Sequence, residues 1–200
     1  MTPYKSLFSN QLMTGETGIL EYHYDQIDST NMEAETFLKQ LSPSDAATLA
    51  PGVVFTAKTQ LYGQGQFGRT WISEPGGLYY TFMRPYPHYD PSKSTQIVVA
   101  IGQRIANTIA QITSLPVVHV HPNDLYIGDK KLGGILIKST HWNGQTVAII
   151  GIGVNINQSQ FPDIIRLDAT SCYLESSIHY DPAEFTAKLT STLKEFLDSQ

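Results

Sequence analysis

The sequence predicts an α+β domain, a mixed and largely antiparallel sheet with flanking helices. Two observations lead to this prediction. An Asn143-Gly144 dipeptide separates two β-branched apolar stretches, and Asn-Gly between strands is the strongest short signal for a hairpin. Helical apolar periodicity recurs between and after the strand-like segments. Strands paired by hairpins, with helices between them, favour the α+β class.

Strand-like segments, recognised by alternation or β-branched content, occur along most of the chain: 19–27, 53–57, 77–83, 117–120, 132–139 and 146–154. Behind the helix N-cap cluster Asp28-Ser29-Thr30-Asn31, apolar residues fall on one helical face: Ala34, Phe37, Leu38 and Leu41. The spacing of isoleucine and valine predicts a long helix over 96–112, and 182–197 forms an amphipathic helix. No linker divides these elements, so we expect one domain over 19–200, after a loose arm over 1–18.

Composition excludes several classes of function. With 200 residues and a net charge of −5, the chain lacks the clustered basic residues of a broad nucleic-acid surface. Cys172 is the only cysteine, which indicates a reducing compartment. The first residues lack the layout of a signal peptide, and no apolar run is long enough to span a bilayer. We therefore expect a cytoplasmic protein with no membrane or nucleic-acid partner.

A glycine-rich loop follows the 53–57 strand. Gly63, Gly65 and Gly68 fit the G-x-G-x-x-G pattern, but the loop leads into another strand and opens no helix, so the context excludes a dinucleotide fold. Glycines let backbone N–H groups approach an anion, and Arg69 adds a planar cationic fork. The alternative is a surface loop in which Arg69 forms only a salt bridge.

Lys131 stands at the start of the 132–139 strand, before Gly133 and Gly134. A lysine there either caps the sheet edge or points into a cleft, where it could stabilise charge on a transferring group. Glycines in a strand remove side chains where something approaches the backbone. Asn123 and Asp124 follow Pro122, and from the residues alone they would make Asx-turn hydrogen bonds.

Taken in order, these segments resemble the catalytic domain of biotin protein ligases, in the biotin and lipoate ligase superfamily. The matching motifs cover about residues 19–197 and are Asp28 to Asn31, Gln60, Gly63 to Trp71, Pro122-Asn123-Asp124, Lys131, Gly151 to Asn155, and Ala169-Thr170-Ser171. The resemblance implies a fold like that of class II aminoacyl-tRNA synthetases. In contrast to many members of the family, we expect neither a helix-turn-helix domain nor a C-terminal β-barrel here, because the matching motifs fill almost the whole sequence.

The resemblance implies an ATP-dependent, AMP-forming enzyme that makes biotinoyl-5′-AMP and passes biotin to a lysine of a biotin-acceptor domain, the carboxyl carrier protein of a biotin-dependent carboxylase. Mg²⁺ would accompany ATP, and no metal site of the protein's own is expected. Catalysis would rest on Lys131, Arg69 and Asp124, with Asp124 orienting the incoming amine. The residues implied for biotin are Ser29, Thr30, Gln60, Gly63, Gln64, Gly65, Lys131 and Gly134. The residues implied for the nucleotide are Gln66, Gly68, Arg69, Trp71, Asn123 and Asn155.

The chain departs from the family pattern at several places. Gln64 and Phe67 stand where basic residues are common, Val120 stands where lysine is usual, and His121 stands where a tryptophan normally precedes Pro-Asn-Asp. Losing one charge-assisted hydrogen bond costs roughly 1.5–3 kcal/mol. Two alternatives therefore stay open: a non-catalytic relative that binds biotin or its adenylate, and an acyltransferase for lipoate or octanoate. Pairing at a free sheet edge would give a homodimer, and the sequence alone does not decide this.

Overall fold

The computed structural model describes residues 10–14, 18–86 and 89–199 of the chain. Its strands are β1 (Asn10–Thr14), β2 (Leu20–Ile27), β3 (Val53–Gln60), β4 (Gly77–Pro85), β5 (Val117–Val120), β6 (Asp124–Ile127), β7 (Lys130–Trp142) and β8 (Gln145–Asn155). Its α-helices are α1 (Thr30–Gln40), α2 (Ala46–Leu49), α3 (Ser94–Thr113), α4 (Cys172–Ser176) and α5 (Pro182–Asp198). Short 3₁₀ turns are η1 (Pro43–Asp45), η2 (Gln66–Gly68) and η3 (Pro91–Lys93).

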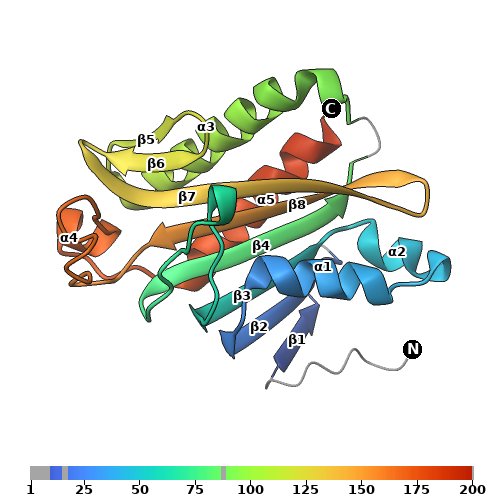
Figure 1. Cartoon of the computed structure of the whole chain (residues 1–200), viewed down its shortest axis with the longest axis horizontal. Coiled ribbons are helices and arrows are strands. Elements are labelled where there is room, and N and C mark those ends of the chain that lie inside the picture. The colour runs from blue at the N-terminus through green and yellow to red at the C-terminus, as the bar shows by residue number, and fades with distance from the viewer. Residues whose placement is uncertain (1–9, 15–17, 87–88, 200) are drawn as a thin grey trace.

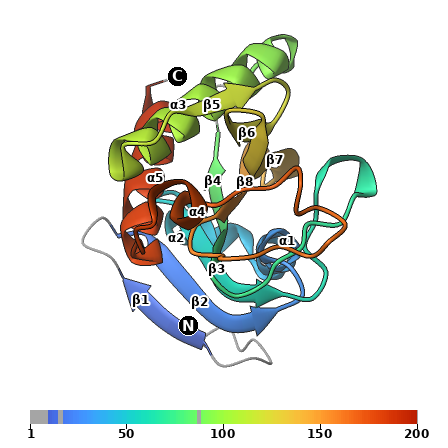
Figure 2. The same ribbon diagram turned by 90° about the vertical axis from the view of Figure 1, so that its left-hand side faces the viewer.

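Within the described residues, all the strands belong to one sheet of order β1-β2-β3-β4-β8-β7-β6-β5. Strands β2 and β3 run parallel, and the other neighbouring strands pair antiparallel. The sheet is therefore mixed and largely antiparallel, as the sequence predicts. Helices α3 and α5 cover one side of it, and α1 covers part of the other (Figures 1 and 2).

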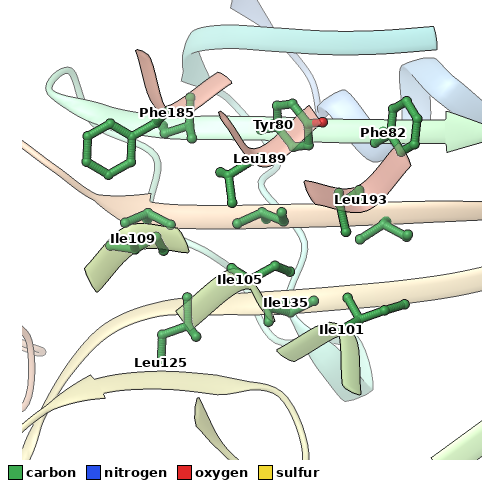
Figure 3. Close-up of a cluster of buried hydrophobic side chains, with 14 of the residues drawn as sticks. Tyr80, Phe82, Ile101, Ile105, Ile109, Leu125, Ile135, Phe185, Leu189 and Leu193 are labelled. Carbon is green, nitrogen blue, oxygen red and sulfur yellow. The ribbon is translucent and has the colours of Figure 1, made fainter. Parts of the chain in front are cut away.

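The side covered by α3 and α5 holds the larger apolar cluster. Alternate residues of β4 point into it, among them Tyr80 and Phe82, and they meet Ile105 of α3 and Leu189 of α5 (Figure 3). Each of these side chains is at most 1% exposed. Burial of a large apolar side chain contributes roughly 1.5–3 kcal/mol, so this cluster fixes both helices against the sheet.

The opposite side holds a smaller cluster under α1. Phe37 of α1 packs against Tyr22 and Phe55, with ring centroids 5.4–5.6 Å apart among the three. Helix α1 covers β3 and parts of β4 and β8, and the Asn31 side chain at its start lies against Gly151 of β8. The glycine-rich stretch of β7 and β8 on this side of the sheet positions the site.

The β7–β8 turn confirms the hairpin prediction. Asn143 and Gly144 adopt φ values of 47° and 75°, as a two-residue type I′ turn requires. The prediction of a loose arm over 1–18 is wrong in part, because β1 (Asn10–Thr14) extends the sheet by pairing with β2. The rest of that arm lies almost wholly outside the described residues. No helix in the described part of the chain is both long and apolar enough to cross a membrane.

Candidate active site

A cleft of about 380 Å³ opens on the α1 side of the sheet, over β4, β7 and β8. Successive residues of a strand face opposite sides, so Gly151, Gly153 and Asn155 face the cleft while the residues between them enter the large core. The volume lies within the usual range of roughly 300–1,000 Å³ for small-molecule sites. On β8, the floor of the cleft therefore consists of glycine backbone without side chains, and it ends at the buried Asn155.

Trp71 fills the space above that floor. A Cβ at Gly153 would lie 2.7 Å from Cε2 and Nε1 of the indole, so only glycine fits there. A Cβ at Gly134 of β7 would lie 3.4 Å from Cζ3 of the same ring, which is an ordinary contact distance. Trp71 is therefore the group that approaches Gly153 and Gly134, while the Asn31 side chain approaches Gly151.

At one end of the cleft, a chain of hydrogen bonds runs from α1 into the sheet. Backbone N–H of Thr30 donates to Gln60 Oε1 over 2.9 Å, and the Thr30 hydroxyl donates to the same oxygen. Thr81 then donates to Thr30 Oγ1, and Asn31 Nδ2 donates to Thr81 Oγ1. Because a backbone N–H can only donate, it fixes the direction of the whole chain and leaves Asn31 Oδ1 as a free acceptor.

Lys131 lies at the middle of the cleft. Its Nζ is 2.6 Å from Asp124 Oδ1 and 5.7 Å from the centre of the Trp71 ring. The side chains of Lys131 and Asp124 are 27% and 21% exposed, so the pair is partly shielded from water. An ammonium held there can attract a carboxylate or phosphate, and a carboxylate beside it can accept a proton.

The other end of the cleft is built from the end of β8. Asn155 is buried, and its Nδ2 donates to the carbonyl of Thr170 over 2.9 Å. Asn123 is buried as well, and its Nδ2 donates to the carbonyl of Ile135. Among the described residues no backbone N–H donates to Asn123 Oδ1, so the expected Asx turn is absent there, and the amide nitrogen ties Asn123 to the neighbouring strand β7.

The glycine loop closes on itself beside the cleft. Gly65 N–H donates to the carbonyl of Arg69, and the Arg69 guanidinium donates back to the carbonyl of Gln66. Phe67 has a φ of 58° and is 92% exposed, so it points to solvent. The basic residue common at position 67 in the family would therefore be remote from the cleft floor.

A lysine of β7 lies beside Gln64 of the glycine loop. Lys138 Nζ lies 2.7 Å from Glu35 Oε1 and 3.1 Å from Gln64 Oε1. The lysine thus joins α1 to the glycine loop across the sheet. Gln64 carries no charge itself but is held by a cation.

Unpaired polar atoms gather in this cleft. Among the described residues, the buried side-chain N and O atoms without a hydrogen-bond partner are Asn31 Oδ1, Gln66 Oε1, Trp71 Nε1 and Gln158 Oε1. All belong to residues that line the cleft. Each of these atoms is inaccessible to water in this structure, so the residues around the cleft carry an unsatisfied polar cost of about 1–3 kcal/mol per atom.

The structure brings most of the sequence-predicted site residues together. Those that line the cleft are Ser29, Thr30, Gln60, Gln64, Gly65, Gln66, Arg69, Trp71, Asn123, Asp124, Lys131, Gly134 and Asn155. Gly63 and Gly68 do not line it. Gly63 packs instead against the carbonyl of Trp71, which a Cβ would overlap, and Gly68 faces open space with a φ of 74°.

Sequence patterns do not reveal the segment that closes the far end. Gln158, Phe161, Pro162 and Ile165 line the cleft there. They come shortly after Asn155, but they have no helical or strand periodicity and so give no signal. The one available hint is the apolar residues that flank a proline in a polar stretch. No group of three or more His, Cys, Asp or Glu side chains that could hold a metal ion occurs in the described residues.

Comparison with known proteins agrees with this geometry. The model of the biotin/lipoate A/B protein ligase family matches residues 25–157. The bifunctional ligase/repressor BirA of Escherichia coli is 28% identical over 173 residues, which is 86% of this chain and 51% of that protein. The biotin–[acetyl-CoA-carboxylase] ligase of Paracoccus denitrificans is 28% identical over 71% of this chain and 63% of its own length. The chain spans about half the length of the BirA relatives that it matches.

Solved structures give the same result. The biotin protein ligase of Aquifex aeolicus in complex with biotin and ATP superposes with a TM-score of 0.71 at 27% identity, covering 90% of this chain and 70% of that one. The Leishmania major biotin protein ligase with biotinyl-5-AMP has a TM-score of 0.72 over 90% of this chain and 75% of its own, at 21% identity, and so supports the fold alone. From the family model and the shared fold, the chain belongs to the biotin/lipoate A/B protein ligase family.

Proposed function

We propose that this chain is an ATP-dependent biotin protein ligase. The observation that carries the proposal is the order of groups along one cleft: the Thr30–Gln60 hydrogen-bond chain at one end, Lys131 in the middle and Asn155 at the other end. An acid with a polar ring fits the first end, and a nucleotide base fits the last. The acid carboxylate and the α-phosphate would then meet beside Lys131.

In the first step, a carboxylate oxygen of biotin attacks the α-phosphorus of ATP. The bond from that phosphorus to the bridging oxygen breaks, and pyrophosphate leaves with the electron pair. Lys131 Nζ would stabilise the negative charge that builds on the α-phosphate oxygens. Arg69 of the glycine loop also lines the cleft, and its guanidinium would bind the phosphates of ATP. Mg²⁺ would arrive with the phosphates of ATP and be held by few protein ligands.

In the second step, the amine of an acceptor lysine attacks the acyl carbon of biotinoyl-5′-AMP. An amide bond forms, the acyl–phosphate oxygen bond breaks, and AMP leaves. The amine must lose a proton, and Asp124 is the carboxylate beside Lys131 that could orient it. The acceptor is expected to be the carboxyl carrier protein of a biotin-dependent carboxylase. A homodimer would use a free edge of the sheet, at β1 or β5.

The test is to incubate the purified chain with biotin, ATP, Mg²⁺ and a biotin-acceptor domain, and to weigh the acceptor by mass spectrometry. The expected result is a gain equal to biotin less one water, which needs ATP and is lost in Lys131→Ala. Lys130→Ala is the matched control, because Lys130 is exposed and does not line the cleft. An acceptor that stays unmodified while biotin still binds would contradict the proposal and favour a non-catalytic binding protein. Modification by lipoate or octanoate in preference to biotin would also contradict it.

A further inference from the structure

Thr81 lies in the middle of β4 and is fully buried, with an exposed fraction of 0%. It does not line the cleft, but its hydroxyl donates over 2.9 Å to Oγ1 of Thr30, which does. The oxygen of Thr81 also accepts a hydrogen bond from Asn31 Nδ2 over 3.2 Å. Thr81 can therefore affect a ligand in the cleft only through a residue that lines it, and Thr30 is the one to which it donates.

A glycine of β8 makes room for the contact between Asn31 and Thr81. Gly151 lies directly across from Thr81 in the antiparallel pair of β4 and β8. A Cβ at Gly151 would overlap Asn31 Nδ2, so the Asn31 amide occupies the space that a side chain there would fill. The glycine thus lets the first turn of α1 reach the sheet and hold the Thr81 hydroxyl between two partners.

The carbonyl of Trp71 gives the hydrogen bonds at this end of the cleft a fixed direction, in agreement with the backbone N–H of Thr30. A carbonyl can only accept, so the Ser73 hydroxyl donates to it and accepts from Gln60 Nε2. Gln60 Oε1 therefore faces Thr30 and accepts from its hydroxyl. Because Thr30 uses its one hydroxyl proton there, its oxygen can only accept from Thr81.

This direction determines what the Thr30 hydroxyl can offer a ligand. Its oxygen has two lone pairs, and the bond from Thr81 uses one of them. Any hydrogen bond between this hydroxyl and a ligand must use the other lone pair, and the ligand must be the donor. A ring that carries an N–H meets this requirement, whereas a ring of carbon and sulfur does not.

We propose that Thr81 is a positioning residue for the acid substrate: by donating to Thr30, it directs the Thr30 hydroxyl to accept a hydrogen bond from an N–H of the acid. This inference rests on the proposed function, which places the acid at the Thr30 end of the cleft. Without the Thr81 hydroxyl, Thr30 remains but loses the neighbour that holds its direction. The acid then binds more weakly, while the nucleotide, at the other end, is unaffected.

The experiment measures dissociation constants by calorimetry for biotin and, separately, for ATP. The proteins are the unaltered chain, Thr81→Val, Thr81→Ala, Thr81→Ser, Thr30→Val and the double variant with Thr30→Val and Thr81→Val. Thr56→Val is the matched control, because Thr56 is also a buried threonine, its hydroxyl bonds His23, and it lies outside this cleft. Melting temperatures establish which variants are folded, and Thr81→Ala serves as the test if Thr81→Val is not.

Thr81→Val and Thr81→Ala are expected to weaken biotin binding about three- to tenfold, the range of one hydrogen bond, and to leave ATP binding within about twofold. Thr81→Ser keeps the hydroxyl and should restore the biotin affinity. In the Thr30→Val background, adding Thr81→Val should have no further effect, because Thr81 acts through Thr30. A merely structural role would weaken ATP binding as well and would persist in the double variant.

Unchanged biotin affinity in both Thr81→Val and Thr81→Ala overturns the inference. A loss that Thr81→Ser does not restore, or that persists in the Thr30→Val background, overturns it as well. Because binding is measured without transfer, a chain whose biotin affinity depends on Thr81 through Thr30 but that labels no acceptor keeps this inference and loses the proposed function. A chain that labels its acceptor while biotin affinity ignores Thr81 does the reverse, and an unaltered chain that binds no biotin loses both.

Discussion

At the scale of single residues, glycines decide the shape of the cleft. Because Gly153 has no side chain, the Trp71 indole can pack against its backbone, and Gly77 leaves room for the Gln158 amide in the same way. In both cases the missing Cβ lets a polar or aromatic side chain lie directly on the backbone of the sheet. The sequence predicts the close approach at the strand glycines but not what approaches, since Trp71 comes from a loop far away in the sequence.

Substituting Gly153 should disrupt the site without unfolding the chain. In Gly153→Ala, the new Cβ would lie 2.7 Å from two atoms of Trp71, so the indole must move away from Lys131. A displacement of about 1 Å in a catalytic site can cost roughly a hundredfold in rate, and we expect adenylate formation to slow at least about tenfold. Pyrophosphate release measures this rate.

The matched control for Gly153→Ala is Ser139→Ala, an exposed position on β7. Alanine is compatible with a strand, so the melting temperature of Gly153→Ala should stay close to that of the unaltered chain. Unchanged pyrophosphate release in Gly153→Ala would show that the position of Trp71 does not matter to the reaction.

At the scale of elements, Lys138 connects parts of the molecule that the sequence keeps apart. Its Nζ meets Glu35 of α1 and Gln64 of the glycine loop. The Lys138–Glu35 pair is about one-third exposed, since both side chains are 35% exposed, so its contribution is screened by solvent. The hydrogen bond from Lys138 to Gln64 links this pair to the glycine loop.

Removing this charge should loosen biotin binding modestly. In Lys138→Met the aliphatic part of the side chain remains but the ammonium is gone, and we expect the dissociation constant for biotin to rise about two- to fivefold. Lys58→Met is the matched control, because Lys58 also pairs with a carboxylate, that of Asp25 at 2.7 Å, but is far more exposed and, among the described residues, does not bind the glycine loop as Lys138 does. Equal biotin affinity in the unaltered chain and Lys138→Met would remove the loop-holding role.

Elements with a regular pattern can be predicted from the sequence, and elements made by long-range pairing cannot. The 96–112 prediction matches α3 (Ser94–Thr113) closely, because its isoleucines repeat at helical spacing over many turns. Strand β6 (Asp124–Ile127) begins where the sequence predicts a turn, since its four residues are too few to show alternation and it exists by pairing with β5 and β7. The sequence correctly places Ser29 at the start of α1, but it does not show that Gln60, thirty residues away, binds the backbone N–H of Thr30.

At the scale of the whole molecule, the main apolar core and the candidate active site lie on opposite faces of the sheet. One face carries α3 and α5 (Figure 2) together with the large apolar cluster, and the other carries the cleft beside α1. Alternation along β4 and β8 serves both faces at once, because each strand sends apolar residues to one side and small or polar residues to the other. This division explains why the fold class alone does not fix the site, which depends on loops that cross the open face.

The whole molecule is expected to hold the acid at the Thr30–Gln60 end of one cleft and the base at its Asn155–Gln158 end. A crystal structure of the chain with bound biotinoyl-5′-AMP tests this arrangement most directly. We predict the ring of biotin beside Thr30 and Gln60, the phosphate within hydrogen-bond distance of Lys131 Nζ, and adenine between the Phe161 segment and Asn155. An adenylate bound in the reverse direction, or outside this cleft, would contradict it.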